Sequence, residues 1–226
     1  LDLMQLLNAK HLEARGPDRL LEARLKTMET AFRMQSDASE AFDLNLEPEE
    51  TRETYGRSHF SNGCLLARRL AERGVRFTQV YYGNGQPWDT HRQHNKSMRR
   101  LCADIDRPIA ALLTDLKARG LLGETLVIWG GEFGRTPTSE GTDGREHHPF
   151  GFTMWLAGGG IKGGHVHGAT DDFGWHAVKD KVHVHDLHAT ILHTLGLDHE
   201  ELTFRYGGRD FRLTDVHGRV VREILA

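Results

Sequence analysis

The sequence has few cysteines, no long hydrophobic run and almost no net charge. Cys64 and Cys102 are too few for a disulfide framework and lack the Cys-x-x-Cys spacing of a metal site. No apolar run approaches the ~18–20 residues that span a bilayer, so we expect no membrane span. A formal net charge of −3 over 226 residues gives no broad basic field, so we expect no nucleic-acid partner. What remains is the composition of an ordinary globular domain.

The length predicts one domain, or one large piece of a bigger one. We expect residues 1–226 to form a single domain that is mainly helical over 1–74 and α/β over 75–226. Leu1 is not a natural first residue, so we expect the sequence to be part of a longer chain. The oligomeric state is left open by the sequence.

Apolar periodicity predicts four helical segments, at 1–40, 58–74, 95–119 and 184–195. Pro108 is expected to kink or break the third of them. Residues 43–57 are acidic and aperiodic, and Pro48 interrupts them, which predicts a loop.

Strands are predicted at 75–82, 124–129 and 150–157, and two short ones around a turn at Asp215–Gly218. The first two flank the third helix, and such strand–helix–strand units give parallel strands with a right-handed connection. The sequence therefore predicts an α/β fold with a mostly parallel sheet flanked by helices and a helical segment in front.

Histidine and glycine are abundant in the second part of the chain. Thirteen of the 15 histidines lie at or after His91, and glycines cluster there in pairs and triplets. This pattern favours a metal-binding or catalytic surface built from loops, although histidine is also tolerated on an ordinary polar surface.

Acidic and imidazole side chains follow the predicted strands. Asp89 and His91 come after the first strand, Glu132 and Arg135 after the second, and His147 directly before the third. Ligands bind beyond the carboxyl ends of parallel strands, so these loops are expected to meet at one rim. Carboxylate and imidazole together are ligands for a divalent ion of the zinc, manganese or iron type.

Each of these residues also has a structural interpretation. Asp89 and His91 alone would look the same in an exposed turn, and Arg135 could either grip an oxyanion or neutralise Glu132. Asp186 is best explained as a favourable charge at a helix N-terminus. The roles of His185 and His188 stay open, and the pairs His165/His167 and His183/His185 are weak candidates.

Several long motifs carry a family resemblance. The runs LLARRLAERGVRF, WDTH, LVIWGGEFGRTP, GREHHPFGF, LAGGGIKGG, HDLHATILHTLGLD and GRDFRLTDVHG closely resemble the bacterial family called domain of unknown function 1501. That family is grouped with the alkaline phosphatase and sulfatase superfamily, and the resemblance covers essentially the whole chain. It implies an alkaline phosphatase-like fold, of which this sequence would be a C-terminal part lacking the first strand or strands.

The resemblance also implies a site. Members carry an Asp with a nearby His, then an acid, then a further metal His, which match Asp89 and His91, Glu132, and His147 here. The family pattern favours His147 over His148 as the ligand, and Pro149 commits His148 to the strand entry. Phe133 stands where members usually have a second ligand, which puts a second metal in doubt. The Ser, Thr or Cys nucleophile of the superfamily lies upstream of any residue matched here.

By resemblance, the chain is expected to be a metal-dependent hydrolase of the sulfatase or phosphatase type. One or two divalent ions (zinc, manganese or calcium) would act on a small-molecule or saccharide sulfate or phosphate ester, with Arg135 as the oxyanion clamp. Relatives begin with an export signal, which implies a periplasmic or extracellular protein. The alternative is a non-catalytic metal- or ligand-binding member of the same fold.

Overall fold

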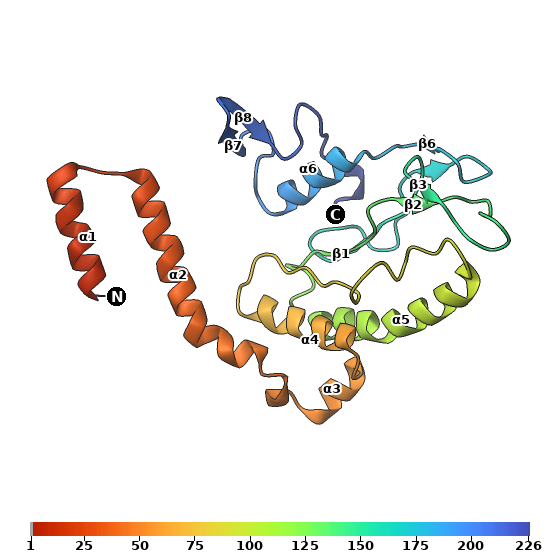
Figure 1. The fold of residues 1–226 in the computed structure, drawn as a ribbon, viewed down its shortest axis with the longest axis horizontal. Helices are drawn as coiled ribbons and strands as arrows, with labels where there is room; N and C mark the ends of the chain where they lie inside the picture. Colours follow the sequence, from red (N-terminus) through yellow and green to blue (C-terminus); the bar gives the residue numbers. More distant parts are fainter. Residues whose placement is uncertain (1) are drawn as a thin grey trace.

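Helices come first along the chain, and short strands follow (Figure 1). The computed structural model describes residues 2–226, and the description of side chains leaves out residues 2, 33 and 35–38. The helical part comprises α1 (Asp2–Arg15), α2 (Arg19–Phe42), the 3-10 turn η1 (Leu44–Leu46), α3 (Glu49–Tyr55), α4 (His59–Glu72) and α5 (His94–Ala118). One later helix, α6 (Val184–Thr194), and a 3-10 turn, η2 (Arg222–Ile224), lie among the strands.

The first two helices project away from the rest of the chain (Figure 1). The predicted helix at 1–40 is in fact two, because Gly16 and Pro17 separate α1 from α2. The Asp18 side chain then caps α2 by accepting hydrogen bonds from the backbone N–H groups of Leu20 and Leu21. On the apolar face that the periodicity predicts for α2, Met28 and Phe32 are 61% and 58% exposed.

The main hydrophobic core lies between α3, α4 and α5. Tyr55, Cys64, Leu65 and Ala111 form one buried cluster, and Val80 packs against it from the segment that follows α4. The predicted inner face of α5 is confirmed: among its members Leu101, Ile105 and Leu116 are buried. Burial of this kind contributes roughly 1.5–3 kcal/mol for each large apolar side chain.

A buried ion-pair network fastens α4 to its neighbours. Arg68 is 1% exposed, and its guanidinium lies 2.5 Å from Glu47 and 2.6 Å from Glu72. Arg69 also pairs with Glu47 and donates to the Ala41 carbonyl at 2.8 Å. Because each buried charge has an opposite charge at hydrogen-bond distance, the cost of removing these groups from water is offset.

Two sequence predictions about the helices are wrong. The segment 43–57, predicted as a loop, contains η1 and α3. Pro48 precedes the first helical residue and Glu49 and Glu50 occupy the first turn, both of which favour a helix start. Pro108 does not break α5, which continues through it. Pro108 is fully buried, so packing of α5 on α3 and α4 offsets the ~3 kcal/mol cost of a helical proline.

The strands form four separate antiparallel pairs within residues 2–226. They are β1 (Val127–Trp129) with β4 (Trp155–Ala157), β2 (Gly134–Arg135) with β3 (His147–His148), β5 (Ala169–Thr170) with β6 (Ala177–Lys179), and β7 (Thr203–Tyr206) with β8 (Arg209–Arg212). The predicted strands at 124–129 and 150–157 are therefore present but short. The alkaline phosphatase-like parallel sheet stays a prediction.

The predicted strand at 75–82 is wrong for this structure, which assigns no strand there. Only part of the segment packs on the helices: Val80 lies against the core, whereas Phe77 and Tyr81 are each 74% exposed. The Val80 side chain approaches Gly63 so closely that a Cβ there would lie 2.9 Å from it. The β-branched and aromatic composition of 75–82 therefore indicates neither a strand nor burial along its whole length.

The tail differs from its prediction as well. The two strands expected around Asp215–Gly218 are absent from 213–226, and the hairpin lies earlier, between β7 and β8. Gly207 and Gly208 join these strands with φ of +56° and +83°, as a tight hairpin turn requires.

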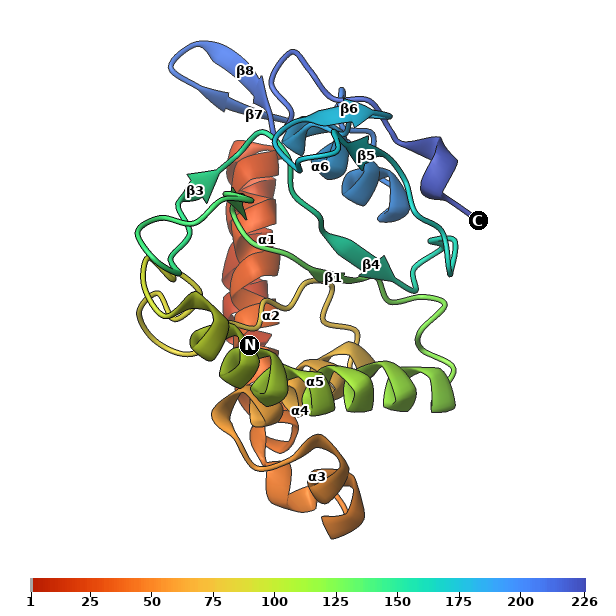
Figure 2. The same cartoon turned by 90° about the vertical axis from the view of Figure 1, so that its right-hand side faces the viewer.

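The pair β1–β4 lies between two helical layers (Figure 2). Helices α4 and α5 cover one side, and α6 covers the other. The loop that carries Asp89 lies between α4 and α5 in the chain, and the β2–β3 hairpin lies beyond one end of β1. This arrangement brings the segments 88–94 and 132–148 together at the edge of the molecule.

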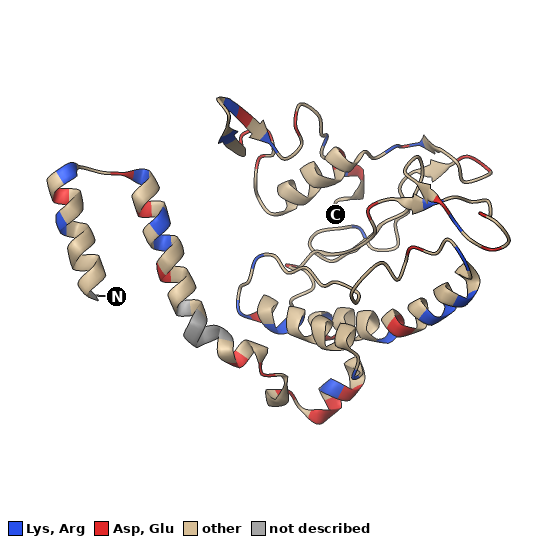
Figure 3. Cartoon of the chain, viewed as in Figure 1, with Lys and Arg blue, Asp and Glu red and all other residues tan. Residues whose placement is uncertain are grey.

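Charges of both signs are spread over both layers, with no face of one sign (Figure 3). Within residues 2–226, none of the helices combines the length and the apolar character that a membrane crossing requires.

Candidate metal centre

Two segments supply the candidate site. Asp89 and His91 belong to the irregular stretch before α5, and Arg135 and His147 belong to β2 and β3. In the β2–β3 hairpin Arg135 pairs directly with His147. Because directly opposed residues point to the same face of a hairpin, both side chains extend toward Asp89.

Asp89, His91 and His147 converge on one point. The Oδ1 atom of Asp89 lies 3.0 Å from Nε2 of His147 and 3.1 Å from Nε2 of His91. One ligand atom from each residue lies within 4.8 Å of the other two. The sequence analysis selected all three as metal-ligand candidates, Asp89 and His91 from the run WDTH and His147 from GREHHPFGF.

This donor set fits a divalent ion. Two imidazoles and one carboxylate are a common ligand set for zinc and related metals. Ligand atoms in a tetrahedral zinc shell are roughly 3.3 Å apart, given metal–ligand distances near 2.0–2.1 Å. The contacts of 3.0 and 3.1 Å at Asp89 Oδ1 are close to that spacing.

Arg135 lies beside the three ligand candidates. Its Nη1 is 3.1 Å from Asp89 Oδ1, and its Nη2 is 3.5 Å from Glu132 Oε1. The Nη1 atom is buried yet makes no hydrogen bond, because the angle to Asp89 is unfavourable. Arg135 therefore neutralises Asp89 and Glu132, as one interpretation of the sequence expected.

Glu132 is not part of the cluster. Its side chain is 63% exposed, and its described polar contact is with Arg135. The sequence prediction that Asp89 and Glu132 converge with a histidine nitrogen is therefore wrong for Glu132 in this structure. Arg135, three residues later in β2, has a side chain that is only 20% exposed. Phe133, the residue after Glu132, places its ring 4.5 Å from that of His147.

Neighbouring groups lower the pKa of Asp89 and raise the pKa of His91. Partial burial opposes the ionised form of Asp89, but the hydrogen bond to His147 and the nearby His91 and Arg135 lower its pKa below the ordinary value. The hydrogen bond to Glu140 raises the pKa of His91, and the charge of Asp89 adds to this effect. Both shifts arise from opposite charges at close range.

Comparison with protein families gives one match over nearly the whole length. The family described as "Protein of unknown function (DUF1501)" matches residues 1–225. The chain belongs to this family. No curated protein and no solved structure matches the chain. Membership in DUF1501 agrees with the resemblance seen in the motifs, while the sulfatase-like branch stays a prediction.

The two tandem histidines of this DUF1501 chain point in different directions. His147 is half exposed and faces Asp89, whereas His148 is buried and donates through Nε2 to the Trp175 carbonyl at 2.5 Å. The ring of His148 also packs edge-on against Trp175. This placement agrees with His147, not His148, as the ligand candidate.

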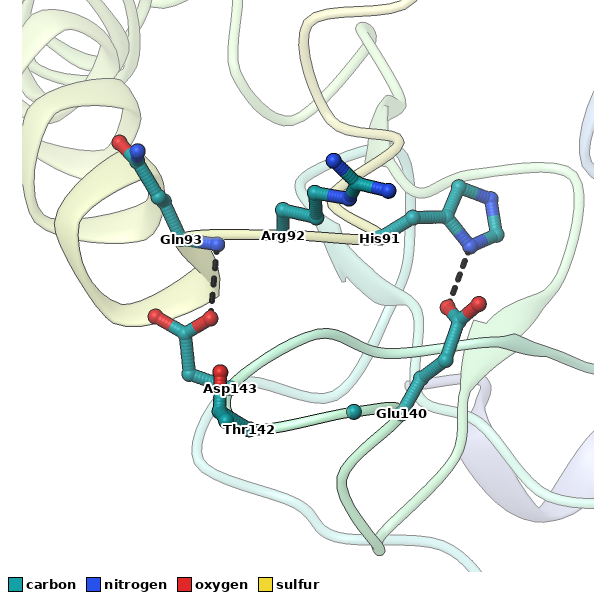
Figure 4. A pocket seen from close by; sticks show the side chains of 7 residues that line it. His91, Arg92, Gln93, Glu140, Thr142 and Asp143 are labelled. Carbon is teal, nitrogen blue, oxygen red and sulfur yellow. Dashed lines mark hydrogen bonds and ion pairs between the residues drawn. The ribbon is translucent and has the colours of Figure 1, made fainter.

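The loop between β2 and β3 holds the His91 segment in place (Figure 4). Gln93 adopts a left-handed backbone, φ +51°, and donates its N–H to Asp143 Oδ1 at 2.9 Å. A Cβ on Gly144 would lie 2.1 Å from the His91 carbonyl oxygen, so only glycine fits there. The two segments enclose a shallow pocket of about 500 Å³ lined by His91, Arg92, Gln93, Glu140, Gly141, Thr142 and Asp143.

Sequence reasoning missed Glu140 and Gly144. Glu140 contacts Nδ1 of His91 at 2.6 Å, across 49 positions of the chain. Glu140 lies outside the quoted runs, and Gly144 opens the run GREHHPFGF but carries no ligand chemistry. Only the spacing of the loop between β2 and β3 brings them to His91, and that spacing carries no signal in a single sequence.

The other histidines do not form a comparable group. Asp186 accepts from the N–H groups of His183 and Arg219, which confirms its structural interpretation. His188 bonds the Val184 carbonyl within α6, while the rings of His185 and His217 stack at 5.7 Å. Across residues 2–226, only the Asp89 cluster brings three ligand atoms close enough for a metal ion.

Proposed function

We propose that this DUF1501 chain contributes the metal-binding and anion-binding part of a hydrolase that cleaves sulfate or phosphate esters. The observation that carries the proposal is the convergence of Asp89, His91 and His147 beside the guanidinium of Arg135. A metal site next to a guanidinium is what an oxyanion ester requires, since its negative oxygens need both a cation and planar donors.

Each residue has a distinct task in this proposal. Asp89 supplies the anionic oxygen that holds a divalent cation, and His91 and His147 supply neutral nitrogen donors through Nε2. When bound, the ion would polarise the ester oxygen and lower the pKa of the attacking group. We assign no nucleophile to residues 1–226.

Arg135 binds and orients the ester in this scheme. Its guanidinium is only 20% exposed, and it already lies against the negative charge of Asp89. A sulfate or phosphate oxygen competes with Glu132 and Asp89 for its N–H groups. Because Glu132 is exposed and its contact is 3.5 Å long, it is the weaker competitor.

The exposure of the site favours a small-molecule or saccharide ester that enters from solvent. His91 and His147 have half-exposed side chains, and the pocket of Figure 4 opens beside His91. An exported location, in the periplasm or outside the cell, is part of the same proposal because it rests on the same family resemblance.

The second candidate is a metal- or ligand-binding protein without catalysis. Phe133 favours it, because an aromatic ring lies against His147 where a second metal would need a ligand. With Glu132 directed outward as well, the described residues supply ligands for one ion rather than two.

The test combines metal analysis with a substrate screen on the full-length protein. Elemental analysis should find about one divalent ion per chain, and aryl phosphates and sulfates should be hydrolysed in a chelator-sensitive way. Asp89→Asn should lose the ion and the turnover, while His193→Ala, which alters an exposed histidine on α6, should change neither. Bound metal without turnover of any ester would support the binding protein, and absence of metal would overturn both candidates.

A further inference from the structure

The ring of His91 lies between two carboxylates. Its Nε2 is 3.1 Å from Asp89 Oδ1, and its Nδ1 is 2.6 Å from Glu140 Oε2 (Figure 4). A neutral imidazole carries one proton and one lone pair, so the partner of one nitrogen decides what the other offers. A carboxylate at Nδ1 keeps the proton there and leaves the lone pair of Nε2 directed toward Asp89 and His147.

Glu140 is fixed in position by the backbone. Its N–H and carbonyl both pair with Gly144, at 3.0 and 2.9 Å, which closes a tight turn. The next residue, Arg145, donates its N–H to the Thr90 carbonyl, and Asp143 accepts from the N–H of His94. The turn is thus hydrogen-bonded to the chain on both sides of His91. These backbone hydrogen bonds hold the Glu140 carboxylate next to the His91 ring.

We propose that Glu140 is a positioning residue for His91 that fixes its ring orientation and tautomer, so that Nε2 is preorganised to bind a divalent cation. This inference rests on the metal site of the proposed function and adds a residue to it. Carboxylates that hold the second nitrogen of a ligand histidine typically contribute about 10–100-fold in metal affinity.

The alternative is that Glu140 and His91 form an ordinary surface ion pair. Their side chains are 37% and 43% exposed, and pairs this exposed add little to stability. The two interpretations therefore predict different results. A surface pair affects neither metal affinity nor the tautomer, while a positioning residue affects both and leaves the stability of the metal-free protein unchanged.

The experiment is a Zn²⁺ titration of the full chain against a competing chelator. We expect Glu140→Ala to weaken Zn²⁺ binding about 10–100-fold. Glu140→Gln should fall between Ala and the wild type, because its amide oxygen still accepts from Nδ1 without the charge. Glu146→Gln is the matched control: it removes an exposed carboxylate from the same loop and should leave Zn²⁺ affinity unchanged.

A second measurement reports the tautomer directly. Long-range ¹⁵N NMR of the zinc-loaded protein, assigned with a His91→Asn variant, should show a protonated Nδ1 and a metal-bound Nε2 in the wild type. In Glu140→Ala the Nδ1 signal should shift and broaden, while the unfolding midpoint of the metal-free protein should stay the same.

The outcomes separate this inference from the proposed function. Equal Zn²⁺ affinity and equal ¹⁵N shifts in wild type and Glu140→Ala would overturn the role of Glu140 and leave the hydrolase proposal standing. Weakened binding in Glu140→Ala, with no ester hydrolysed by the wild type, would support Glu140 and overturn the hydrolase. A wild type that binds no Zn²⁺ would overturn both.

Discussion

Two regions of the molecule differ in how they use charged side chains. We call the helices α3, α4 and α5 the helical scaffold, and the segments 88–94 and 132–148 the loop-built site. Both contain arginine–carboxylate pairs. In the helical scaffold Arg68 is 1% exposed and Glu47 is 7% exposed, so these charges satisfy one another away from water. In the loop-built site the Arg135, Asp89 and His147 side chains are 20%, 20% and 50% exposed.

This difference in exposure indicates which property each set of charged side chains affects. In the helical scaffold the buried Arg68 guanidinium is surrounded by carboxylates of Glu47, Glu72 and Asp115, and these ion pairs contribute to folding. The loop-built site concentrates three positive or polar groups on one carboxylate oxygen, Asp89 Oδ1, and leaves their side chains partly exposed. Substitutions should therefore affect stability in the first region and ligand binding in the second.

The largest expected effect is in the helical scaffold. Arg68→Ala should lower the free energy of unfolding by about 3–5 kcal/mol, because it leaves buried carboxylate charge without its partner. Urea denaturation followed by circular dichroism measures this. The matched control is Arg205→Ala, which removes an exposed pair with Asp210 in the β7–β8 hairpin and should cause no measurable loss. Equal losses in both variants would contradict the comparison.

The tandem histidines test the comparison within two adjacent residues. His147→Ala should weaken Zn²⁺ binding by more than about 100-fold, since a ligand is removed rather than its support, and should leave stability unchanged. His148→Ala should retain Zn²⁺ but lose roughly 1–3 kcal/mol of stability, because the Trp175 carbonyl loses its donor. Zinc titration and urea denaturation of both variants measure these effects. If His148→Ala loses Zn²⁺ and His147→Ala loses stability, the ligand assignment is wrong by one residue.

Arg135→Lys should weaken the binding of inorganic sulfate or phosphate about tenfold and leave metal content intact. Lysine keeps the charge near Asp89 but loses the planar fork, and one charge-assisted hydrogen bond accounts for about that factor. Isothermal titration of the zinc-loaded protein with phosphate measures it. Unchanged anion affinity would show that Arg135 only neutralises Asp89 and Glu132.

The smallest expected effect is a pH dependence of the helical scaffold. Burial alone would raise the pKa of Glu47, but hydrogen bonds and charge attraction from Arg68 and Arg69 lower it below the ordinary value. A lowered pKa in the folded state means that the contribution of Glu47 is complete above the unfolded pKa, near ~4.3, and is lost as pH falls through the folded pKa. Urea midpoints of wild type and Glu47→Gln should therefore differ at pH 6 and converge in acid.

Much of the helical scaffold could be predicted from the sequence, because apolar periodicity is a local signal. The inner face of α5 was correct, while Pro108 was misleading because tertiary packing outweighs a local cost. The start of α3 at Pro48 was overlooked although its residues carry it. The strand predicted at 75–82 is absent, because β-branched and aromatic composition does not reveal whether a neighbouring strand exists to pair with the segment.

The site was partly predictable for a different reason. Asp89, His91 and His147 carry metal-binding chemistry in their side chains, so residue type and motif were enough to select them. Glu132 has the same chemistry, but its side chain is 63% exposed and pairs with Arg135, which sequence alone does not show. Glu140 could not be predicted from the sequence, because its role depends on a contact with His91 across 49 positions.

The register of the β2–β3 hairpin has a consequence for comparing relatives. Arg135 lies opposite His147, and Gly134 lies opposite His148. Because successive strand residues face opposite sides, losing a single residue from the connecting loop would turn His148 toward Asp89 and His147 away from it. Family members with loops of different length can be aligned so that their tandem histidines coincide. In such an alignment, a ligand histidine of one member can stand in the same column as a buried, structural histidine of another. The length of the loop, rather than the identity of the letters, decides which histidine corresponds to which.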